Sequence, residues 1–330
     1  MQYVQLGQTD IKISKIAFGC MSTVANPTYD GLEDAEGIAT IRSALDQGIN
    51  FIDTAPAYGN GASEELLGRA IEDVRDQVVI ANKISSQVMS AEEVMSECEK
   101  SLKLLRTDYI DLYQIHWPRR QVPLEETLKA MHDLHKQGKV RSLGVCNFGI
   151  QDLTEAIGTG VPLVTNQIAY SLLSRAVEFE VEALCKEHGI GFLCYSPLAQ
   201  ALLAGKYESA DDVPAERART RMFSKDRPQS RHDEPGCEAE VFEAIAGIRK
   251  VSDRVGRSMA DVSLAWLLHK DSVASVLVGA SRPDQVARNA ASASVELSAE
   301  DIAELDAVTE SVKQAMGESL DMWATPSRIR

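Results

Sequence analysis

The sequence predicts a (β/α)8 TIM barrel, in which eight parallel strands are surrounded by helices. The main observation is that short apolar runs alternate with amphipathic helical segments along the chain. Strands that alternate with helices pair in parallel through crossovers. No linker of biased composition divides the chain, so we expect residues 1–330 to form a single domain. The strand-like runs are residues 16–19, 50–54, 78–83, 109–116, 140–147, 163–167, 191–196 and 274–278.

The segments between these runs carry the spacing of amphipathic helices. Ser90 and Glu93 form a capping box at the start of one helix. A second helix is expected to end just before Gly138, and a last one opens with Ser298 and Asp301. The apolar stripes on these helices are Val94, Cys98, Leu102 and Leu105; Leu124, Leu128, Met131 and Leu134; and Ile302, Leu305 and Val308.

Two further segments complete the expected barrel. Residues Val4–Leu6 and Ile11–Ile13 flank a turn, and we expect them to form an N-terminal hairpin that closes the barrel floor. Residues 205–236 are rich in Arg, Asp, Pro and Ser and follow the seventh strand. A long irregular stretch of this kind predicts an active-site loop inserted into the barrel. A C-terminal helix and tail follow the last strand.

The main alternative fold is a doubly wound sheet that binds a dinucleotide through the pattern G-x-G-x-x-G. The nearest candidate is Gly59, Asn60 and Gly61, but Glu64 occupies the third glycine position. The fingerprint is absent, so a nicotinamide cofactor would bind by another route.

Composition and charge exclude several classes of function. The chain is 44% hydrophobic and 25% charged, as in ordinary globular proteins. Its net charge of −15 would repel nucleic acid and anionic lipid, so we expect neither as a partner. The start MQYVQLGQTD has no basic region followed by an apolar run, so we expect no secretion signal. No stretch approaches the roughly 18 consecutive apolar residues of a membrane span. Six scattered cysteines without a CxxC pair indicate reduced thiols, so the expected location is the cytoplasm.

Polar residues at the ends of three neighbouring strands are the candidate catalytic group. Asp53 ends the second strand and leads to Tyr58, Lys83 ends the third, and His116 ends the fourth. Each has a structural explanation when taken alone: a strand-end cap, an amphipathic loop ring, a lysine that reaches solvent, and a core histidine. Their convergence on neighbouring strand ends favours a catalytic site.

These four residue types suit the protonation of a carbonyl oxygen. A tyrosine hydroxyl has a pKa near 10, and a nearby ammonium lowers it by stabilising the phenolate. A carboxylate fixes the ammonium, and a histidine beside the hydroxyl orients the carbonyl. Together, these residues are expected to provide a proton donor for a carbonyl that receives a hydride.

His132 and His135 have helical spacing but no third ligand, so no metal is expected.

Several ordered stretches resemble the aldo-keto reductase superfamily over nearly the whole chain. They are GINFIDTAPAYGNGASEELLGRAI, LLRTDYIDLYQIHWP, EETLKAMHDLHKQGKVRSLGVCNF, CYSPLAQALLAGKY and VLVGASRPDQVARN. The resemblance assigns the family's catalytic tetrad to Asp53, Tyr58, Lys83 and His116, and it implies carbonyl reduction by NADPH, with NADH as the possible substitute.

The resemblance also implies a cofactor site. Gly19 and Cys20 would border the nicotinamide ribose near Asp53, Asn147 and Gln167 would bind the carboxamide, and Tyr195 would stack on the ring. Ser196, Leu198 and Lys206 would hold the pyrophosphate. The adenosine end would lie at Gly279, Ser281, Arg282, Gln285 and Asn289, beside a helix N-terminus that can bind an anion. The chain departs from the common family pattern at Cys20, Cys146 and Ala201.

The function expected from the sequence is therefore reduction of a small-molecule aldehyde, ketone or sugar-type carbonyl to an alcohol. Hydride comes from nicotinamide C4 and the proton from Tyr58. Three alternatives stay open: an NAD-dependent sugar or polyol dehydrogenase, a regulatory subunit that senses the cofactor, and a lyase with Lys83 as a Schiff-base amine. Substrate shape depends on residues 21–31, 117–122, 205–236 and the tail, where Trp323 could reach the site.

Overall fold

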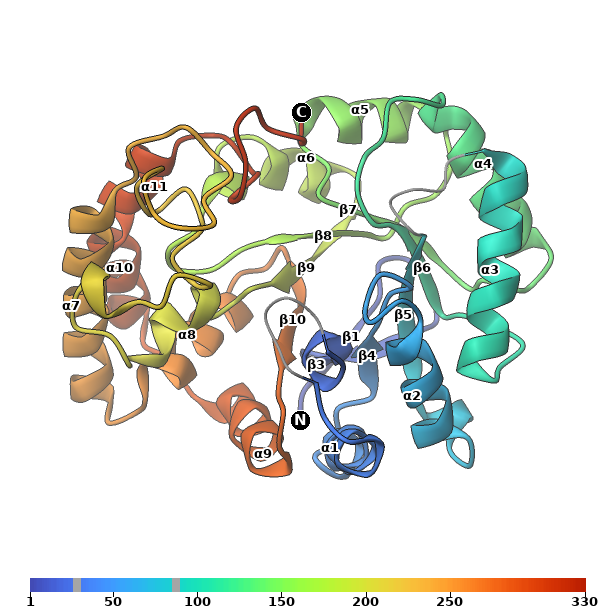
Figure 1. Cartoon of the computed structure of the whole chain (residues 1–330), viewed down its shortest axis with the longest axis horizontal. Coiled ribbons are helices and arrows are strands. Elements are labelled where there is room, and N and C mark those ends of the chain that lie inside the picture. The colour runs from blue at the N-terminus through green and yellow to red at the C-terminus, as the bar shows by residue number, and fades with distance from the viewer. Residues whose placement is uncertain (26–30, 85–89) are drawn as a thin grey trace.

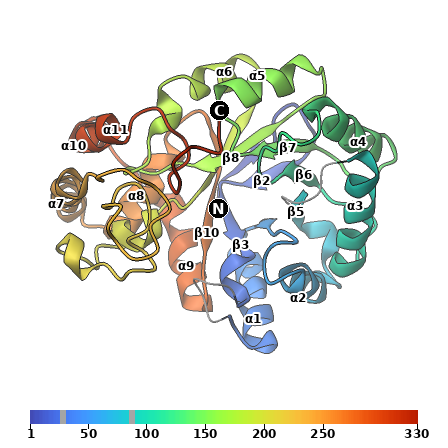
Figure 2. The same ribbon diagram turned by 45° about the horizontal axis from the view of Figure 1, so that its top comes forward.

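The computed structural model describes residues 1–25, 31–84 and 90–330. Eight parallel strands close into a barrel in the order β10-β3-β4-β5-β6-β7-β8-β9, and helices surround it (Figures 1 and 2). Every strand overlaps one of the predicted apolar runs, so the predicted (β/α)8 fold is confirmed. The barrel strands are β3 (Ile16–Gly19), β4 (Phe51–Asp53), β5 (Val79–Ile84), β6 (Leu112–Ile115), β7 (Leu143–Cys146), β8 (Thr165–Ala169), β9 (Gly191–Tyr195) and β10 (Val273–Gly279).

The helices carry the features that the sequence predicted for them. The Ser90 side chain accepts from the Glu93 amide and Glu93 reaches back, which confirms the capping box of α3. Val94, Cys98, Leu102 and Leu105 are buried against the barrel. The α-helices are α1 (Asp34–Asp46), α2 (Ala62–Ile71), α3 (Ala91–Leu105), α4 (Leu124–Lys136), α5 (Ile150–Gly158), α6 (Val181–Glu187), α7 (Glu238–Val255), α8 (Met259–Leu268), α9 (Pro283–Ala291), α10 (Ala299–Val308) and α11 (Glu310–Met316).

The N-terminal hairpin closes one end of the barrel as expected. Strands β1 (Tyr3–Gln5) and β2 (Lys12–Ser14) pair antiparallel. A separate apolar cluster joins the hairpin to the barrel interior, and its burial excludes water from the floor. Its buried members are Leu6, Ile11, Ile13, Ala17, Phe51, Val79, Ala81, Leu112, Val164, Leu193 and Leu277.

The inserted loop and the tail lie together at the opposite end. Residues 205–236 follow the seventh barrel strand, β9, and hold one short 3-10 helix, Ala210–Asp212. Arg231 forms an isolated bridge with Ala324 in the tail. The tail continues to the start of α5, where the Gln151 and Asp152 amides donate to the Arg330 carbonyl, each at 3.1 Å (Figure 1). Among the described helices, none has both the length and the apolar character needed to cross a membrane.

The chain after β9 makes a left-handed turn without glycine. Ala199, Gln200 and Ala201 have φ angles of +45°, +57° and +71°. A side chain in the left-handed region is strained because its Cβ lies too close to the backbone carbonyl oxygen. At position 201, the family that the sequence resembles commonly has glycine. Glycine adopts the left-handed conformation without this strain, which explains why it is favoured at this position.

We predict that Ala201→Gly stabilises the protein. The left-handed conformation costs an alanine about 1–2 kcal/mol, and the greater freedom of glycine in the unfolded chain offsets roughly 0.4–1 kcal/mol of that gain. The free energy of unfolding should rise by about 0.5–1 kcal/mol in urea denaturation. The control is Ala204→Gly, at a residue without positive φ, which should lower stability. A loss in both variants would contradict the strain argument.

Candidate active site

A cavity of about 790 Å3 opens where the barrel strands have their carboxyl ends, the position of active sites in this fold. Its size is typical of ligand sites, which measure about 300–1,000 Å3. Most of the predicted site residues line it. They are Gly19, Asp53, Tyr58, His116, Asn147, Gln167, Tyr195, Ser196, Leu198, Lys206, Gly279, Ser281, Gln285 and Asn289.

The four predicted catalytic residues lie together around one ammonium group. Lys83 in β5 donates from Nζ to Asp53 Oδ1 at 2.6 Å, contacts Oδ2 of the same carboxylate, and donates to the Thr54 carbonyl at 2.9 Å. The same Nζ is 3.3 Å from the Tyr58 hydroxyl oxygen. Asp53 ends the neighbouring strand β4, so parallel pairing brings the two charges together. Lys83 therefore joins the carboxylate to the phenol.

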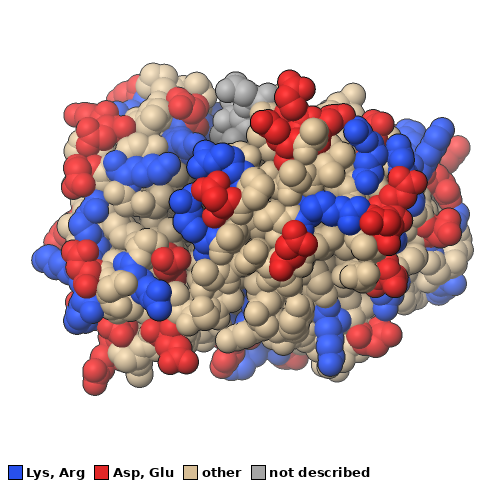
Figure 3. All heavy atoms as spheres, turned by 90° about the horizontal axis from the view of Figure 1, so that it is seen from below, with Lys and Arg blue, Asp and Glu red and all other residues tan. Residues whose placement is uncertain are grey.

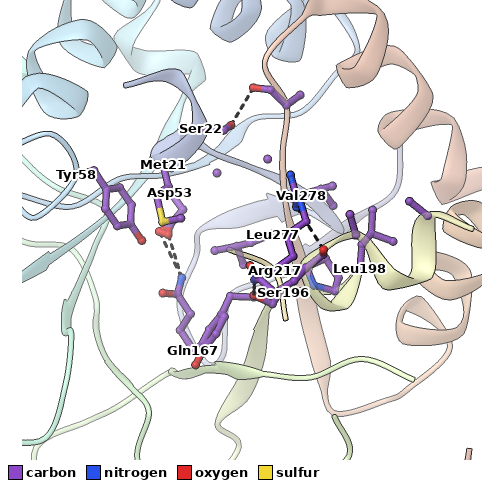
Figure 4. A pocket seen from close by; sticks show the side chains of 18 of the residues that line it. Met21, Ser22, Asp53, Tyr58, Gln167, Ser196, Leu198, Arg217, Leu277 and Val278 are labelled. Atoms are coloured by element: carbon purple, nitrogen blue, oxygen red, sulfur yellow. Dashed lines mark hydrogen bonds between the residues drawn. The ribbon is translucent and has the colours of Figure 1, made fainter. Parts of the chain in front are cut away.

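The buried ion pair keeps its charges by mutual attraction. Lys83 is 0% exposed. Burial has the largest single effect and would lower the Lys83 pKa. The attraction and hydrogen bond of Asp53, together with smaller effects of Tyr58 and Cys146, outweigh burial, and the pKa is raised. Burial raises the pKa of Asp53, and this shift is opposed by the Lys83 charge and by the Gln167 amide, whose Nε2 is 3.1 Å from Asp53 Oδ1 (Figure 4). The lysine is thus an ammonium at neutral pH.

Tyr58 differs from the expectation in the direction of its pKa shift. We expected Lys83 to lower the pKa, but burial has the larger effect and raises the Tyr58 pKa to about 12. The Lys83 ammonium opposes that rise by favouring the phenolate. The phenol is therefore protonated at neutral pH, as a proton donor must be. The lysine's effect is to limit the consequence of burial.

His116 follows β6 and is neutral. Burial, assisted by the Lys83 charge, lowers the pKa of His116 to about 3. Its ring packs edge-on to Tyr58, with centroids 6.0 Å apart. Its buried Nδ1 has no hydrogen-bond partner among the described residues. A neutral imidazole beside the phenol can orient a polar group by hydrogen bonding without adding charge.

The residues expected around the nicotinamide form a connected polar group. The Tyr195 hydroxyl donates to Asn147 Oδ1 at 2.8 Å, and Asn147 Nδ2 donates to the His116 carbonyl at 3.1 Å. Asn147 has a left-handed φ of +61°, which asparagine tolerates better than most residues. Gln167 lies between Asp53 and Cys146, whose Sγ is 3.5 Å from Gln167 Oε1. Both amides therefore already have protein partners.

Two predicted cofactor residues do not line the cavity. Cys20 is fully buried in the apolar core beside Gly19, and the next residues, Met21 and Ser22, line the cavity instead. Arg282 is 62% exposed and pairs with Asp284 at 3.0 Å. Its expected position at the helix start is right, because it is the N-cap of α9, but its side chain turns to a neighbouring carboxylate.

Other lining residues were not identified from the motifs. Arg288 pairs with the same Asp284 at 2.8 Å and does line the cavity. Trp323 reaches it from the tail as expected. Five further lining residues, not predicted singly, belong to the inserted loop and the tail, two segments that the sequence predicted to shape the substrate site. They are Arg217, Arg219, Gln229, Arg231 and Arg328.

Two remaining sequence expectations concern loops and metals. Of the expected substrate segment 21–31, residues 26–30 lie outside the described part of the chain. His132 and His135 stack with ring centroids 6.1 Å apart. Within the described ranges, no group of three His, Cys, Asp or Glu side chains is arranged to hold a metal ion.

Comparisons with known proteins find relatives that match most of the chain. Aldo-keto reductase YhdN of Bacillus subtilis (strain 168) is 35% identical over 297 residues, 87% of each chain. The NADH-specific methylglyoxal reductase of Escherichia coli (strain K12) is 32% identical over 322 residues, 90% of this chain and 95% of that protein.

Solved structures show the same fold. An aldo/keto reductase from Klebsiella pneumoniae in complex with NADP and acetate matches with a TM-score of 0.73 and 28% identity, over 93% of this chain and 95% of that chain. The model of the Aldo/keto reductase family matches residues 15–310, a range that holds the whole barrel and the four residues predicted to be catalytic. By this match and by its relatives, the chain belongs to the aldo/keto reductase family.

Proposed function

We propose that this protein is an NADPH-dependent reductase of the cytoplasm that converts an aldehyde or ketone, including sugar-type carbonyls, to an alcohol. Tyr58 donates the proton to the carbonyl oxygen. The observation that carries this proposal is the contact between the buried Lys83 ammonium and the Tyr58 hydroxyl at 3.3 Å. All six cysteines are buried free thiols, which suits a reducing compartment.

The protonation states support Tyr58 as the acid. His116 is neutral because burial lowers its pKa to about 3. Lys83 is enclosed by Asp53, Thr54 and Tyr58 and does not line the cavity. The Tyr58 hydroxyl lines the cavity with its proton in place. After transfer, the ammonium stabilises the phenolate, and His116 holds the carbonyl in position.

The residues present suit a nicotinamide dinucleotide. Amide groups of Asn147 and Gln167 lie near Asp53 and Tyr58, as a carboxamide requires, while Lys206 and Arg288 supply positive charge farther along the lining. Ser281, Gln285 and Asn289 would hold the adenosine end. When bound, the reduced cofactor supplies a hydride from nicotinamide C4. The NADP bound to the Klebsiella relative supports NADPH, and the NADH-specific E. coli relative keeps NADH as the alternative.

The enclosure of Lys83 speaks against the lyase alternative. A Schiff-base lysine must be neutral when it attacks and must reach the substrate. Lys83 is fully buried, with its pKa raised by Asp53. The same four residues would serve alcohol oxidation with NAD, so an activity assay is needed to distinguish oxidation from reduction.

A panel of aldehydes, ketones, sugars and polyols, each with NADPH and NADH or their oxidised forms, tests the proposal. We expect reduction of carbonyls with NADPH to give the highest kcat/KM. Preferred oxidation of polyols with NAD would replace the proposal by the dehydrogenase. Tight cofactor binding without turnover of any substrate would favour a regulatory subunit.

Tyr58→Phe should remove most of the carbonyl reduction. The change deletes the proton donor and little else, and general acid catalysis contributes about 10²–10⁴-fold. Cofactor affinity, measured by fluorescence titration, should stay close to that of the wild type. The control is Tyr207→Phe, which removes the same atom outside the cavity lining. A Tyr58→Phe enzyme with near-normal kcat would eliminate Tyr58 as the acid.

We expect the Arg282 guanidinium to exchange Asp284 for the 2′-phosphate when NADPH binds. Arg282→Ala should then raise KM for NADPH about tenfold, the effect of losing a charge-assisted hydrogen bond to that phosphate. KM for NADH, which lacks that phosphate, should hardly change. Arg288→Ala is the comparison, because Arg288 shares Asp284 with Arg282 and also lines the cavity. Selective loss in Arg288→Ala alone would assign the phosphate to Arg288, and equal losses with both cofactors would exclude phosphate recognition by either residue.

A further inference from the structure

The lining of the active-site cavity has a charge opposite to that of the protein. The chain holds 49 acidic and 34 basic residues, with a net charge of −15. On the face shown in Figure 3, acidic and basic side chains are mixed among uncharged areas. Among the described residues that line the cavity, Asp53 is the one acid, and it is paired with Lys83. The lining cations are Lys206, Arg217, Arg219, Arg231, Arg288 and Arg328.

Half of these cations are accounted for by the proposed cofactor site. Lys206 and Arg288 lie on segments assigned to the pyrophosphate and the adenosine end. Arg217 donates to the Gln200 carbonyl at 3.3 Å, in the left-handed turn that follows Ser196 and Leu198 (Figure 4). The remaining three arginines come from the inserted loop and the tail, which supply no predicted cofactor residue beyond Lys206.

These three arginines are grouped with two tryptophans. The Arg328 guanidinium lies 3.9 Å from the ring centroid of Trp117, the residue directly after His116. Arg219 lies 5.3 Å from the ring centroid of Trp323. The Arg231 carbonyl accepts from the Thr325 amide at 3.4 Å, which ties the loop to the tail beside Trp323. Charged and aromatic groups therefore adjoin the catalytic histidine.

The charge balance leaves a net positive charge at this part of the cavity. Arg328 is neutralised by the buried Asp321, with contacts of 2.6 and 2.7 Å. Among the acids of the loop, Glu234 is paired with Arg221 at 2.7 Å. Arg231 is exposed, and none of the described carboxylates forms an ion pair with it. Arg231 is thus available to a ligand that carries negative charge.

We propose that the physiological substrate is an anionic carbonyl compound, with a carboxylate or a phosphate at the end remote from the reacting carbonyl. Arg231 binds that group with Arg219 beside it, and Trp117 and Trp323 enclose the carbon chain. Arginine binds carboxylate and phosphate oxygens with paired N–H donors. A basic cavity in an acidic protein also steers an anion toward the site. This inference rests on the proposed reductase function and specifies its substrate class.

The test compares matched pairs of anionic and neutral substrates in the complete enzyme with saturating NADPH. One pair is 4-oxobutanoate and its methyl ester, and the other is glyceraldehyde 3-phosphate and glyceraldehyde. We expect wild-type kcat/KM to favour the anion of at least one pair about tenfold, as a charge-assisted hydrogen bond does. The pair that shows the preference distinguishes carboxylate from phosphate. Added salt should reduce the preference.

Arg231→Met should lower the preference for the anionic substrate about tenfold, mainly by raising its KM. The control Lys225→Met deletes an equal charge from the same loop, outside the cavity lining, and should keep the wild-type ratio. Wild-type enzyme that reduces the neutral substrates as well as the anions would overturn this inference and leave the reductase function intact. An equal rise in KM for NADPH in Arg231→Met would assign the arginine to the cofactor and also overturn it. If no member of either pair were reduced, the reductase function itself would be in question.

Discussion

The buried ion pair between Lys83 and Asp53 is the interaction on which the site depends. Removing two charges from water is costly unless each has good partners. Here the ammonium has the carboxylate, the Thr54 carbonyl and the Tyr58 hydroxyl, and the carboxylate also has Gln167 from β8. Asp53, Lys83 and Gln167 come from three strands, β4, β5 and β8, so the barrel must close in register before the pair is satisfied. The fold therefore determines the position of the Lys83 ammonium beside the Tyr58 hydroxyl.

The protonation states of the neighbours follow from the same pair and from burial. The Lys83 charge adds to the effect of burial on His116, which stays neutral, and opposes the effect of burial on Tyr58, which stays protonated. The result is one protonated phenol beside one neutral imidazole ring. The positive lining contributed by the inserted loop and tail lies outside this group and bears on which carbonyl compound enters.

The features that the sequence could predict are those determined by strand ends and local chemistry. Parallel strands place their carboxyl ends at one edge, so Asp53, Lys83 and His116 could be grouped without any structure. The capping box at Ser90 is equally local. Cys20 and Arg282 were predicted as cofactor contacts and do not line the cavity, because one turns into the core and the other to Asp284. Arg231 and Arg328 could not be placed, since the loop and the tail meet only in the folded chain.

The most direct test of the role of the ion pair is the pH profile of carbonyl reduction in Lys83→Met. Because Lys83 limits the rise in the Tyr58 pKa, its removal should make the phenol a weaker acid. We expect kcat at neutral pH to fall at least about tenfold and the basic limb, where the phenol loses its proton, to move to higher pH or out of range. The double variant with Asp53→Asn avoids an unpaired buried carboxylate and should show the same shift. A wild-type rate and an unmoved basic limb in both variants would contradict this account.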